Sequence, residues 1–539
     1  MTPRPTPPLL ARVPGGRAAE GAGSAGTGGE PGFDGGPVWM RLIPSVVMLG
    51  VALWGITGPS YWRDEGATLA AVQRPFPQLV RMLGHVDAVH GAYYMIMWPL
   101  VRVAGTGEIV TRLPSAVAVA VAAGLVAALG RRLVSPAAGL AAGLVFAVLP
   151  QISLYGQDAR SYAMVTALGA AGSYLLVRAI GAPGRRQGWL TGYAACLGAM
   201  GALNIFGILL LAAHAVSVAL ACLRQPARAA RVPLALGWLA AAAAAVVLAS
   251  PVLALAVEQR GTASWIKPPE PGTVASLWRL LGPQQLVIGI CVVAVSGLAA
   301  SALAGRAALR ANWPAALPAL AVPWLVVPPA ILIGISFVTP LYVPRYVLYC
   351  LPAAALLAGA GLAALGQAAA AGLAAGGRAA GTRPGRWQAW PGRLGWAAGA
   401  VMLAVIALLG YGMQVSERGP AGHNDNIRRA DKIVAANMRP GDAVIYETPD
   451  NLWAAYPYGL ARLTDIARYQ SPAQSGTLAG TTLPAAVVRQ RITGVSRLWV
   501  VELRHRKRVP LLQGLGLRLA GTWHTAGIWL FLYASRPAA

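Results

Sequence analysis

The sequence predicts an α-helical polytopic membrane protein with about eleven transmembrane helices and a small C-terminal α/β domain outside the membrane. Composition is the first indication: of the 539 residues, 56% are hydrophobic and only 12% are charged. A soluble globular domain carries about 25% charged residues. The second indication is that apolar runs of membrane-spanning length recur from residue 40 to residue 414, after which the pattern becomes that of a soluble domain.

The net charge of +26 does not indicate a nucleic-acid-binding protein. Such proteins gather basic residues on one face of a soluble domain. Here most arginines fall in short loops between apolar runs, where positive charge sets membrane topology. We therefore expect membrane lipids, and no nucleic acid, among the partners.

Three regions follow from the pattern along the chain. Residues 1–37 are rich in Pro, Gly, Ala and Thr and lack apolar periodicity, which predicts a disordered cytoplasmic tail. Residues 38–415 form the predicted transmembrane region, with a large first outer loop over 59–110. Residues 416–539 form the predicted outer α/β domain.

Eleven segments are apolar and long enough to be spans. Residues 93–104 are apolar but short, so we assign them to a helix that lies at the interface or re-enters the membrane. An Ala/Gly/Arg-rich stretch over 367–394 is predicted to be a flexible cytoplasmic linker between the last two spans. The predicted spans cover residues 40–58, 111–130, 136–154, 160–180, 187–203, 205–223, 233–256, 284–305, 316–338, 345–366 and 395–414.

Two independent patterns place the N-terminus in the cytoplasm. With this topology every inside loop carries arginines, for example Arg131 and Arg132 after the second span, as the positive-inside rule requires. Acids are not counted by that rule, yet they follow the same topology. All seven acids between residues 40 and 415 fall on the outer side: Asp64, Glu65, Asp87, Glu108, Asp158, Glu258 and Glu270.

The C-terminal region has the alternation of a soluble α/β domain. The segment 426–438, "NIRRADKIVAANM", predicts an amphipathic helix. The segments 442–447, 497–503 and 527–535 are short, apolar and rich in β-branched or aromatic residues, which predicts strands.

Ionisable side chains gather at the predicted outer ends of the spans, where such residues are costly and usually functional. They occur in three segments that lie far apart in the sequence. Carboxylates beside arginines at an apolar surface suit a substrate with a lipid tail, an anionic head and a reacting hydroxyl. The residues are Asp64, Glu65, His85, Asp87 and His90 in the first loop, Asp158 and Arg160 in "YGQDARSY", and Tyr342, Arg345 and Tyr346 in "TPLYVPRYVLY".

Several short motifs in this order resemble the GT-C glycosyltransferases. They are "DE" after the first span, "DAVHGAYY", "TRLPSA", "GRRL", "YGQDARSYAM" and "VPRYVLYCLP". The chain is similar to the bacterial protein O-mannosyltransferases and the lipid A aminoarabinose transferases over roughly residues 40–366. Each motif alone is weak, whereas several in order with a matching topology are specific.

The resemblance implies an inverting glycosyltransferase that moves a sugar from a polyprenyl-phosphate carrier to an acceptor hydroxyl at the outer face of the cytoplasmic membrane. Mannose is the first choice of sugar, followed by arabinose or another pentose. Asp64 corresponds to the residue that acts as general base. Glu65 would orient the acceptor or tune its neighbour. Arg345 matches an arginine that would stabilise the leaving phosphate, for which a guanidinium fork is suited.

Further residues are substrate-binding candidates by the same resemblance. Arg160 is a second cation for the phosphate. Asp87 and His90 match an Asp and a His that relatives carry before two prolines, whereas this chain has "HGAYY". Asp158 and Tyr342 complete the set, with helix capping or structural pairing as the alternative for Asp87 and Asp158.

No cofactor is implied with certainty, and a divalent metal stays an open alternative. His85, Asp87 and His90 could supply ligands, although their spacing matches no standard site. The acceptor is equally open among a protein, a glycolipid and a glycan.

Two other function classes compete with an enzyme. A flippase or transporter for a lipid-linked sugar would be expected to carry internal repeats and polar residues near the bilayer midplane, whereas the acids here gather at one face and no repeat is apparent. A catalytically silent scaffold would not need the intact "DE" pair.

Overall fold

The structure is a computed structural model that describes residues 38–225, 228–273, 277–304, 316–379, 390–447, 457–502 and 510–535. The tail predicted for residues 1–37 lies outside this range. Trp39–Ala539 forms one compact unit, which is mostly helical and carries a small sheet near its C-terminal end.

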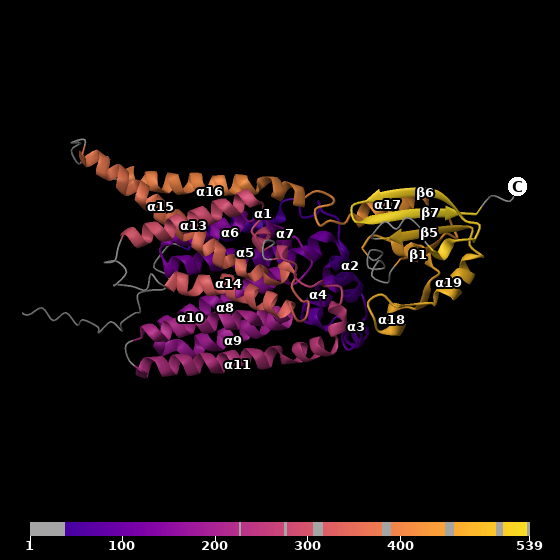
Figure 1. Ribbon diagram of the computed structural model, residues 1–539, viewed down its shortest axis with the longest axis horizontal. Coiled ribbons are helices and arrows are strands. Elements are labelled where there is room, and N and C mark those ends of the chain that lie inside the picture. Colours follow the sequence, from indigo (N-terminus) through magenta and orange to yellow (C-terminus); the bar gives the residue numbers. More distant parts are fainter. Residues whose placement is uncertain are drawn as a thin grey trace, which may run out of the picture. The chain divides into compact units, whose positions relative to one another are not determined.

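Long helices run side by side through the first part of the chain (Figure 1), and each coincides with a predicted span. By length and apolarity, seven of the described helices could cross a membrane, or eight if a bent pair is one span. At the other predicted spans, α1 and α9 do not meet that criterion, and only the part Gln284–Ser296 of α13 is fully described. The helices are α1 (Trp39–Leu53), α5 (Glu108–Leu133), α6 (Pro136–Val148), α7 (Pro150–Gly156), α8 (Tyr162–Gly181), α9 (Arg186–Leu203), α10 (Leu210–Arg224), α11 (Arg228–Glu258), α13 (Gln284–Ala304), α14 (Ala316–Ser336), α15 (Leu351–Ala379) and α16 (Trp390–Glu417).

The segment predicted as a single span over 136–154 is broken. Helices α6 and α7 meet at an angle of 65°, and the break lies at Leu149, whose backbone is extended. Pro150 begins α7, because proline lacks the N–H that would continue the preceding helix. The bend directs the end of α7 toward the turn that carries Asp158.

The flexible linker predicted over 367–394 is partly wrong. Helix α15 continues to Ala379 and α16 begins at Trp390; residues 380–389 lie outside the described range. An Ala-rich sequence resembles a low-complexity linker in composition, but alanine has the highest intrinsic helix propensity, and here the helices extend into it.

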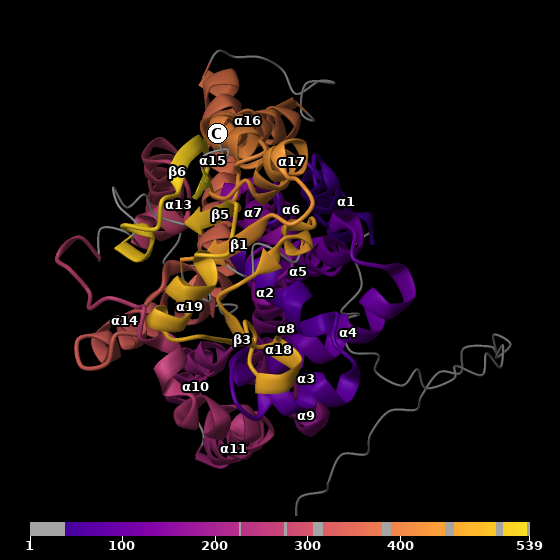
Figure 2. The same cartoon turned by 90° about the vertical axis from the view of Figure 1, so that its right-hand side faces the viewer.

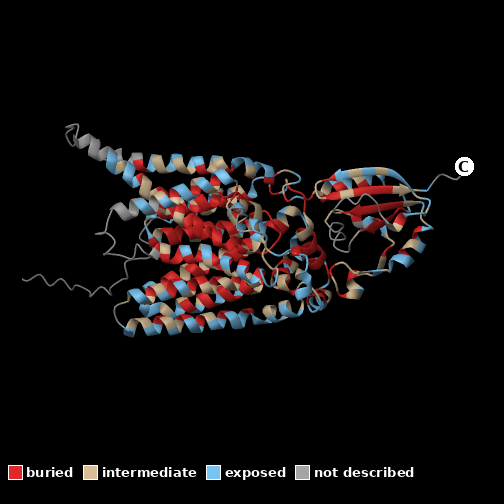
Figure 3. Cartoon of the chain, in the orientation of Figure 1, coloured by how far each residue is buried: buried red, intermediate tan, exposed pale blue. Residues whose placement is uncertain are grey.

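The helical region has a buried interior and an apolar exterior. Figure 3 shows buried residues along the inner helices and exposed residues along α11 and α16. On α11, Leu236, Val247 and Leu248 are each more than half exposed. Such a large exposed apolar surface suits lipid tails and would be unfavourable in water, as expected for a multi-pass membrane protein.

The first loop between α1 and α5 is itself largely helical. It contains α2 (Arg63–Val72), α3 (Phe76–Leu83), the 3-10 turn η1 (Ala88–His90) and α4 (Gly91–Ala104). Helix α4 covers the short apolar segment 93–104 that was assigned to a non-spanning helix, and it is not among the helices long and apolar enough to span.

The C-terminal region forms an α/β sheet structure, as predicted. Its five-stranded sheet has the order β2-β1-β5-β7-β6, with β1 parallel to β2 and β5, and β7 antiparallel to β5 and β6. The predicted strands are β1 (Ala443–Tyr446), β5 (Arg497–Glu502) and β7 (Ile528–Ala534); the sequence analysis missed β2 (Thr464–Asp465) and β6 (Arg518–Thr525), as well as the short pair β3 (Arg468–Gln470) and β4 (Thr481–Thr482).

Helices cover both faces of this sheet (Figure 2). Successive strand residues point to opposite faces, so in β1 Val444 packs with α17 (Ile427–Asn437) and Ile445 packs with α19 (Ala485–Ile492). The predicted amphipathic helix 426–438 is therefore confirmed as α17. Its buried face consists of Ile427, Ala430 and Val434.

Candidate active site

Asp64 and Arg345 form an ion pair at the ends of two elements. Asp64 lies in the first turn of α2, and Arg345 lies in the 3-10 segment η7 (Pro344–Cys350) that leads into α15. The Asp64 Oδ2 and Arg345 Nη2 atoms are 3.4 Å apart, and the two side chains are 21% and 18% exposed. Two residues predicted for the base and for the phosphate ligand are therefore adjacent and accessible.

Aromatic groups surround the Arg345 guanidinium. Its Nε donates a hydrogen bond to Tyr162 Oη at 3.0 Å. The rings of Trp62, Trp265 and Tyr346 each lie 5.7 Å from its central carbon, within the range of a cation–π interaction. These contacts fix the guanidinium and leave its fork directed to Asp64.

Glu65 lies next to Asp64 in the sequence but in the protein interior. Its side chain and that of Arg112 are both fully buried. Arg112 donates from Nε to Oε1 at 2.8 Å and from Nη2 to Oε2 at 2.7 Å, which is the strong two-point geometry of an arginine–carboxylate pair. The Ala159 backbone N–H donates to the same Oε1 at 3.0 Å.

This pairing determines the charge state of Glu65. Burial alone would raise the pKa of Glu65, but attraction and hydrogen bonds from Arg112 outweigh burial and lower the pKa below its ordinary value. Arg112, which lies close to the N-terminus of α5, is also fully buried. Its Nη1 also donates to the carbonyls of Ile56 and Pro59, so it closes the end of the first helix against α2.

Asp87, His90, Tyr94 and Arg160 form one network beside Asp64, in which Tyr94 and Arg160 are buried and Asp87 and His90 are half-buried. Arg160 donates from Nη2 to His90 Nε2 at 2.5 Å and from Nη1 to the Asp64 carbonyl at 3.3 Å. The Tyr94 hydroxyl donates to Asp87 Oδ2 at 2.5 Å. The structure therefore brings together three of the predicted substrate-binding residues, and joins them to the backbone of the predicted base.

Protonation in this network follows from burial. Burial, with repulsion from Arg160 and Arg345, lowers the pKa of His90 well below its ordinary value, so the imidazole is neutral and its Nε2 accepts from Arg160. Its 3.8 Å contact with Asp87 Oδ1 is therefore not an ion pair. Burial raises the pKa of Asp87 to about 6, although Arg160 and Tyr94 act in the opposite direction.

Asp158 is 2% exposed, and it lies in the turn between α7 and α8. Its Oδ1 accepts from the Trp62 indole N–H at 3.0 Å, while its Oδ2 has no hydrogen-bond partner. Burial, together with repulsion from Glu65, raises the pKa of Asp158 above its ordinary value. Asp158 is thus a buried neighbour of Trp62 and Glu65.

Two predicted residues remain, Tyr342 and His85. Tyr342 is half-buried in the extended segment before η7. His85 is exposed and its Nδ1 contacts the Arg81 carbonyl at 2.7 Å. Within the described part of the chain, the group whose ligand atoms approach closely enough for a metal ion is Glu65, Asp158 and His423; it does not include His85, Asp87 and His90.

The C-terminal region contacts the first loop close to this centre. Asp425 Oδ2 accepts from both the backbone N–H and the Nε of Arg63, at 3.1 and 3.0 Å. Arg428 pairs with Glu108 at 2.5 Å, and the Tyr458 hydroxyl donates to the same Glu108 oxygen. The residues after α16 therefore hold the N-terminal end of α2.

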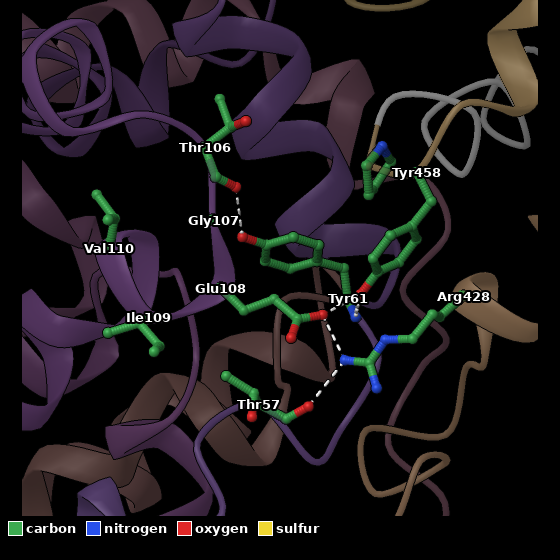
Figure 4. A pocket seen from close by; sticks show the side chains of 10 residues that line it. Thr57, Tyr61, Thr106, Gly107, Glu108, Ile109, Val110, Arg428 and Tyr458 are labelled. Atoms are coloured by element: carbon green, nitrogen blue, oxygen red, sulfur yellow. Dashed lines mark hydrogen bonds and ion pairs between the residues drawn. The ribbon is translucent and has the colours of Figure 1, made fainter.

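A cavity of about 590 Å³ lies at this contact (Figure 4). None of the predicted site residues lines it. Its polar groups include the Glu108–Arg428 pair and the hydroxyls of Tyr61 and Tyr458, which already bond to one another, to backbone or to Thr111. The residues that line it are Thr57, Tyr61, Thr106, Gly107, Glu108, Ile109, Val110, Arg428, Pro457 and Tyr458.

Several residues of the centre were not selected by sequence reasoning. Arg112 lies at the start of a predicted span and Tyr94 lies in a short apolar segment, and neither is among the predicted site residues. His423 lies in a segment assigned to the soluble domain, and nothing in its local sequence points to Glu65. The one available signal was the position of Arg112 in a run of apolar residues, where an unpaired charge is costly.

The chain is similar to known proteins in sequence and in fold. Residues 92–255 match the family model described as dolichyl-phosphate-mannose-protein mannosyltransferase. None of the curated proteins matches the chain. The structure is similar to that of ArnT from Cupriavidus metallidurans in the apo state, with a TM-score of 0.56 and 15% identity over 91% of this chain and 97% of ArnT.

Two more solved structures are similar. ArnT from C. metallidurans bound to undecaprenyl phosphate has a TM-score of 0.57 and 14% identity, over 92% of this chain and 98% of ArnT. The apo oligosaccharyltransferase of Archaeoglobus fulgidus has a TM-score of 0.50 and 10% identity, over 86% and 69% of the two chains. The resemblance predicted from the motif order is confirmed: the protein has the fold of the GT-C membrane glycosyltransferases.

Proposed function

We propose that the protein is an inverting glycosyltransferase that transfers a sugar from a polyprenyl-phosphate carrier to an acceptor hydroxyl at the outer face of the cytoplasmic membrane. The observation that carries the proposal is the accessible Asp64–Arg345 pair. It places a proton acceptor beside a cation, which are the two groups that this displacement needs. The similarity of the fold to an ArnT structure with bound undecaprenyl phosphate supports a lipid-phosphate carrier.

Asp64 is proposed to act as the general base. As the acceptor oxygen attacks the anomeric carbon, its proton passes to the Asp64 carboxylate, a step for which a positioned base contributes about 10²–10⁴-fold in rate. The new C1–O bond forms while the bond from C1 to the phosphate oxygen breaks. The products are the glycosylated acceptor, polyprenyl phosphate and a proton on Asp64 that is later released to water.

Arg345 is proposed to bind the phosphate. The leaving phosphate gains a negative charge as the C1–O bond breaks, and a fixed guanidinium stabilises that charge most when little water is present. Arg345 is held by Tyr162 and by three aromatic rings. Because its fork also contacts Asp64, phosphate binding would draw Arg345 away and leave the carboxylate free to accept the proton.

Glu65 is proposed to be a positioning residue and not a group that touches the substrate. Both of its oxygens bond to Arg112 and neither is exposed. Its bonds to Arg112 and to the Ala159 N–H fix the first turn of α2. Because Asp64 lies in the same turn, these bonds also fix the direction in which its side chain points. Arg160 acts similarly through the Asp64 carbonyl. Asp87 and His90, of which His90 contacts Arg160, are proposed to bind the sugar.

The sugar is proposed to be mannose, with arabinose or another pentose as the second choice. The family model matched by residues 92–255 supports mannose, and the similarity to ArnT supports neither hexose nor pentose by itself. The acceptor belongs to one of three classes with a reacting hydroxyl: protein, glycolipid or glycan.

The test is sugar transfer by purified protein in nanodiscs. Polyprenyl-phosphate mannose, arabinose and glucose are supplied in turn with a membrane extract as acceptor source, and release of lipid phosphate is measured. We expect release from one donor by the wild type and a loss of at least about 100-fold in Asp64→Asn. Glu258→Gln, an exposed acid at the end of α11, is the matched control and is expected to retain activity.

Two results would contradict the proposal. One is donor binding without release of lipid phosphate by the wild type. The other is unchanged release by Asp64→Asn, which would exclude this carboxylate as the base even if the enzyme class were right.

A further inference from the structure

Three ionisable residues from distant parts of the chain meet beneath the Asp64–Arg345 pair. Glu65 lies in the first turn of α2, Asp158 in the turn between α7 and α8, and His423 in the segment between α16 and α17. One potential ligand atom from each lies within 4.8 Å of the other two, and all three residues are buried. No other group of this kind occurs among the described residues.

Two of the three side chains, those of His423 and Asp158, carry polar atoms without partners. His423 is only 5% exposed, and neither of its ring nitrogens has a hydrogen-bond partner; Asp158 Oδ2 has none either. His423 Nδ1 lies 3.6 Å from Glu65 Oε2, which is too long for a hydrogen bond. A buried polar atom without a partner costs about 1–3 kcal/mol, so one imidazole nitrogen of His423 and Oδ2 of Asp158 are available to a shared ligand.

We propose that Glu65, Asp158 and His423 bind a divalent transition-metal ion, and that Zn²⁺ is the ion that this donor set suits. One imidazole nitrogen and two carboxylate oxygens are ordinary zinc ligands, with water in the fourth position. Zinc–ligand distances are about 2.0–2.2 Å. Side-chain shifts of less than about 1 Å would bring the three ligand atoms to these distances from one shared ion. The ion would give a partner to Asp158 Oδ2 and to one ring nitrogen of His423.

The surroundings of the cluster fit a metal centre. Metal-binding carboxylates are generally oriented by further hydrogen bonds. Arg112 and the Ala159 N–H orient Glu65, and the Trp62 indole N–H orients Asp158 through Oδ1. The Trp62 ring also meets the His423 ring edge-on, with centroids 6.3 Å apart.

The ion would have a structural consequence. His423 is contributed by the segment that leads from the last long helix to the sheet, so the metal would tie that segment to the first turn of α2. It would stabilise the position of Asp64 without contacting the substrate. The inference does not depend on glycosyl transfer, and no step of the proposed reaction passes through the ion.

Metal content of tag-free wild-type protein tests the inference directly. The protein is incubated with Zn²⁺, desalted, and analysed by mass spectrometry of the elements and by X-ray absorption at the zinc edge. We expect about one zinc per chain, with nitrogen and oxygen ligands that include one imidazole. Removal of the ion by a chelator is expected to lower the midpoint of thermal unfolding, and Zn²⁺ is expected to restore it.

Matched variants locate the ion. His423→Gln and Asp158→Asn are expected to lose it, whereas His85→Gln, which alters an exposed histidine of the first loop, is expected to retain it. Wild type without stoichiometric zinc or manganese after incubation with either ion would overturn the proposal. Retention of zinc by His423→Gln at the level of His85→Gln would overturn it as well. Metal content and thermal unfolding do not depend on sugar transfer. Their results therefore test the metal site even if the transfer assay contradicts the proposed function.

Discussion

Asp64 and Glu65 are neighbours in the sequence but lie in opposite environments: the Asp64 side chain is 21% exposed beside Arg345, and the Glu65 side chain is fully buried against Arg112. Both lie in the first turn of α2. An α-helix has 3.6 residues per turn, so consecutive side chains point about 100° apart. One carboxylate therefore faces the accessible side of the site, and the other faces the core.

The Arg345 guanidinium should be required for its shape as well as its charge. Arg345→Met is expected to lower kcat/KM for the donor by at least about 100-fold, since it removes a fixed charge from the leaving phosphate. Arg345→Lys keeps the charge but loses the fork and the bond to Tyr162, so an intermediate loss is expected. Steady-state kinetics in nanodiscs measure both, with Arg260→Met in the exposed loop after α11 as control. Equal activity of wild type and Arg345→Met would contradict a phosphate-binding role.

The Glu65–Arg112 pair should be needed for stability. Removal of one member leaves the other as a buried, unpaired charge, which costs about 3–5 kcal/mol. Glu65→Gln and Arg112→Met are each expected to lower the midpoint of thermal unfolding in detergent markedly. The double variant is expected to lose less stability than the two single variants lose in sum, because it contains no unpaired buried charge. Additive losses in this double-mutant cycle would show that the two side chains do not interact.

Asp87 should give a component of stability that depends on pH. Its pKa is raised to about 6, compared with about 3.9 in an unfolded chain. The folded protein therefore favours protonated Asp87, and this stabilisation is complete below about pH 3.9 and is lost as the pH rises through 6. The shift corresponds to about 3 kcal/mol.

Comparison of wild type with Asp87→Asn isolates this component. Unfolding in detergent is followed between pH 4 and pH 7, and Glu258→Gln serves as the control acid. The wild type is expected to lose stability relative to Asp87→Asn as the pH rises over this range, while Glu258→Gln follows the wild type. Parallel profiles for wild type and Asp87→Asn would mean that Asp87 titrates normally.

The contact between Arg428 and Glu108 should hold the C-terminal region to the first loop. Both side chains are partly exposed, at 29% and 13%, so the pair is expected to contribute only about 1 kcal/mol. Arg428→Met is expected to increase cleavage by protease in the segment 418–426, and high salt should have the same effect on wild type. Arg462→Met alters an exposed pair with Asp431 inside the C-terminal region; it is the control and should leave cleavage at 418–426 unchanged. No difference between the two variants would exclude the Arg428 contact as a tether.

The sequence by itself determined the helical class, the position of most helices, the amphipathic helix of the C-terminal region and three of its strands. Apolar periodicity and run length depend on local burial, which the residue order records directly. The order of short motifs also determined which family the chain resembles, and it singled out Asp64 and Arg345 as candidates before any contact between them was known.

Only the tertiary structure decided which charged side chains are buried in ion pairs and which are accessible to a substrate. Nothing local distinguishes Asp64 from Glu65, since the difference is the direction in which each leaves the helix. Arg112, Asp158 and His423 come from three separate elements, and their meeting at Glu65 depends on the bend at Pro150 and on the path of the chain after α16. Ion pairs and ligand sets of this kind are made by packing between distant segments. The sequence around any one member therefore does not show which residues it will meet.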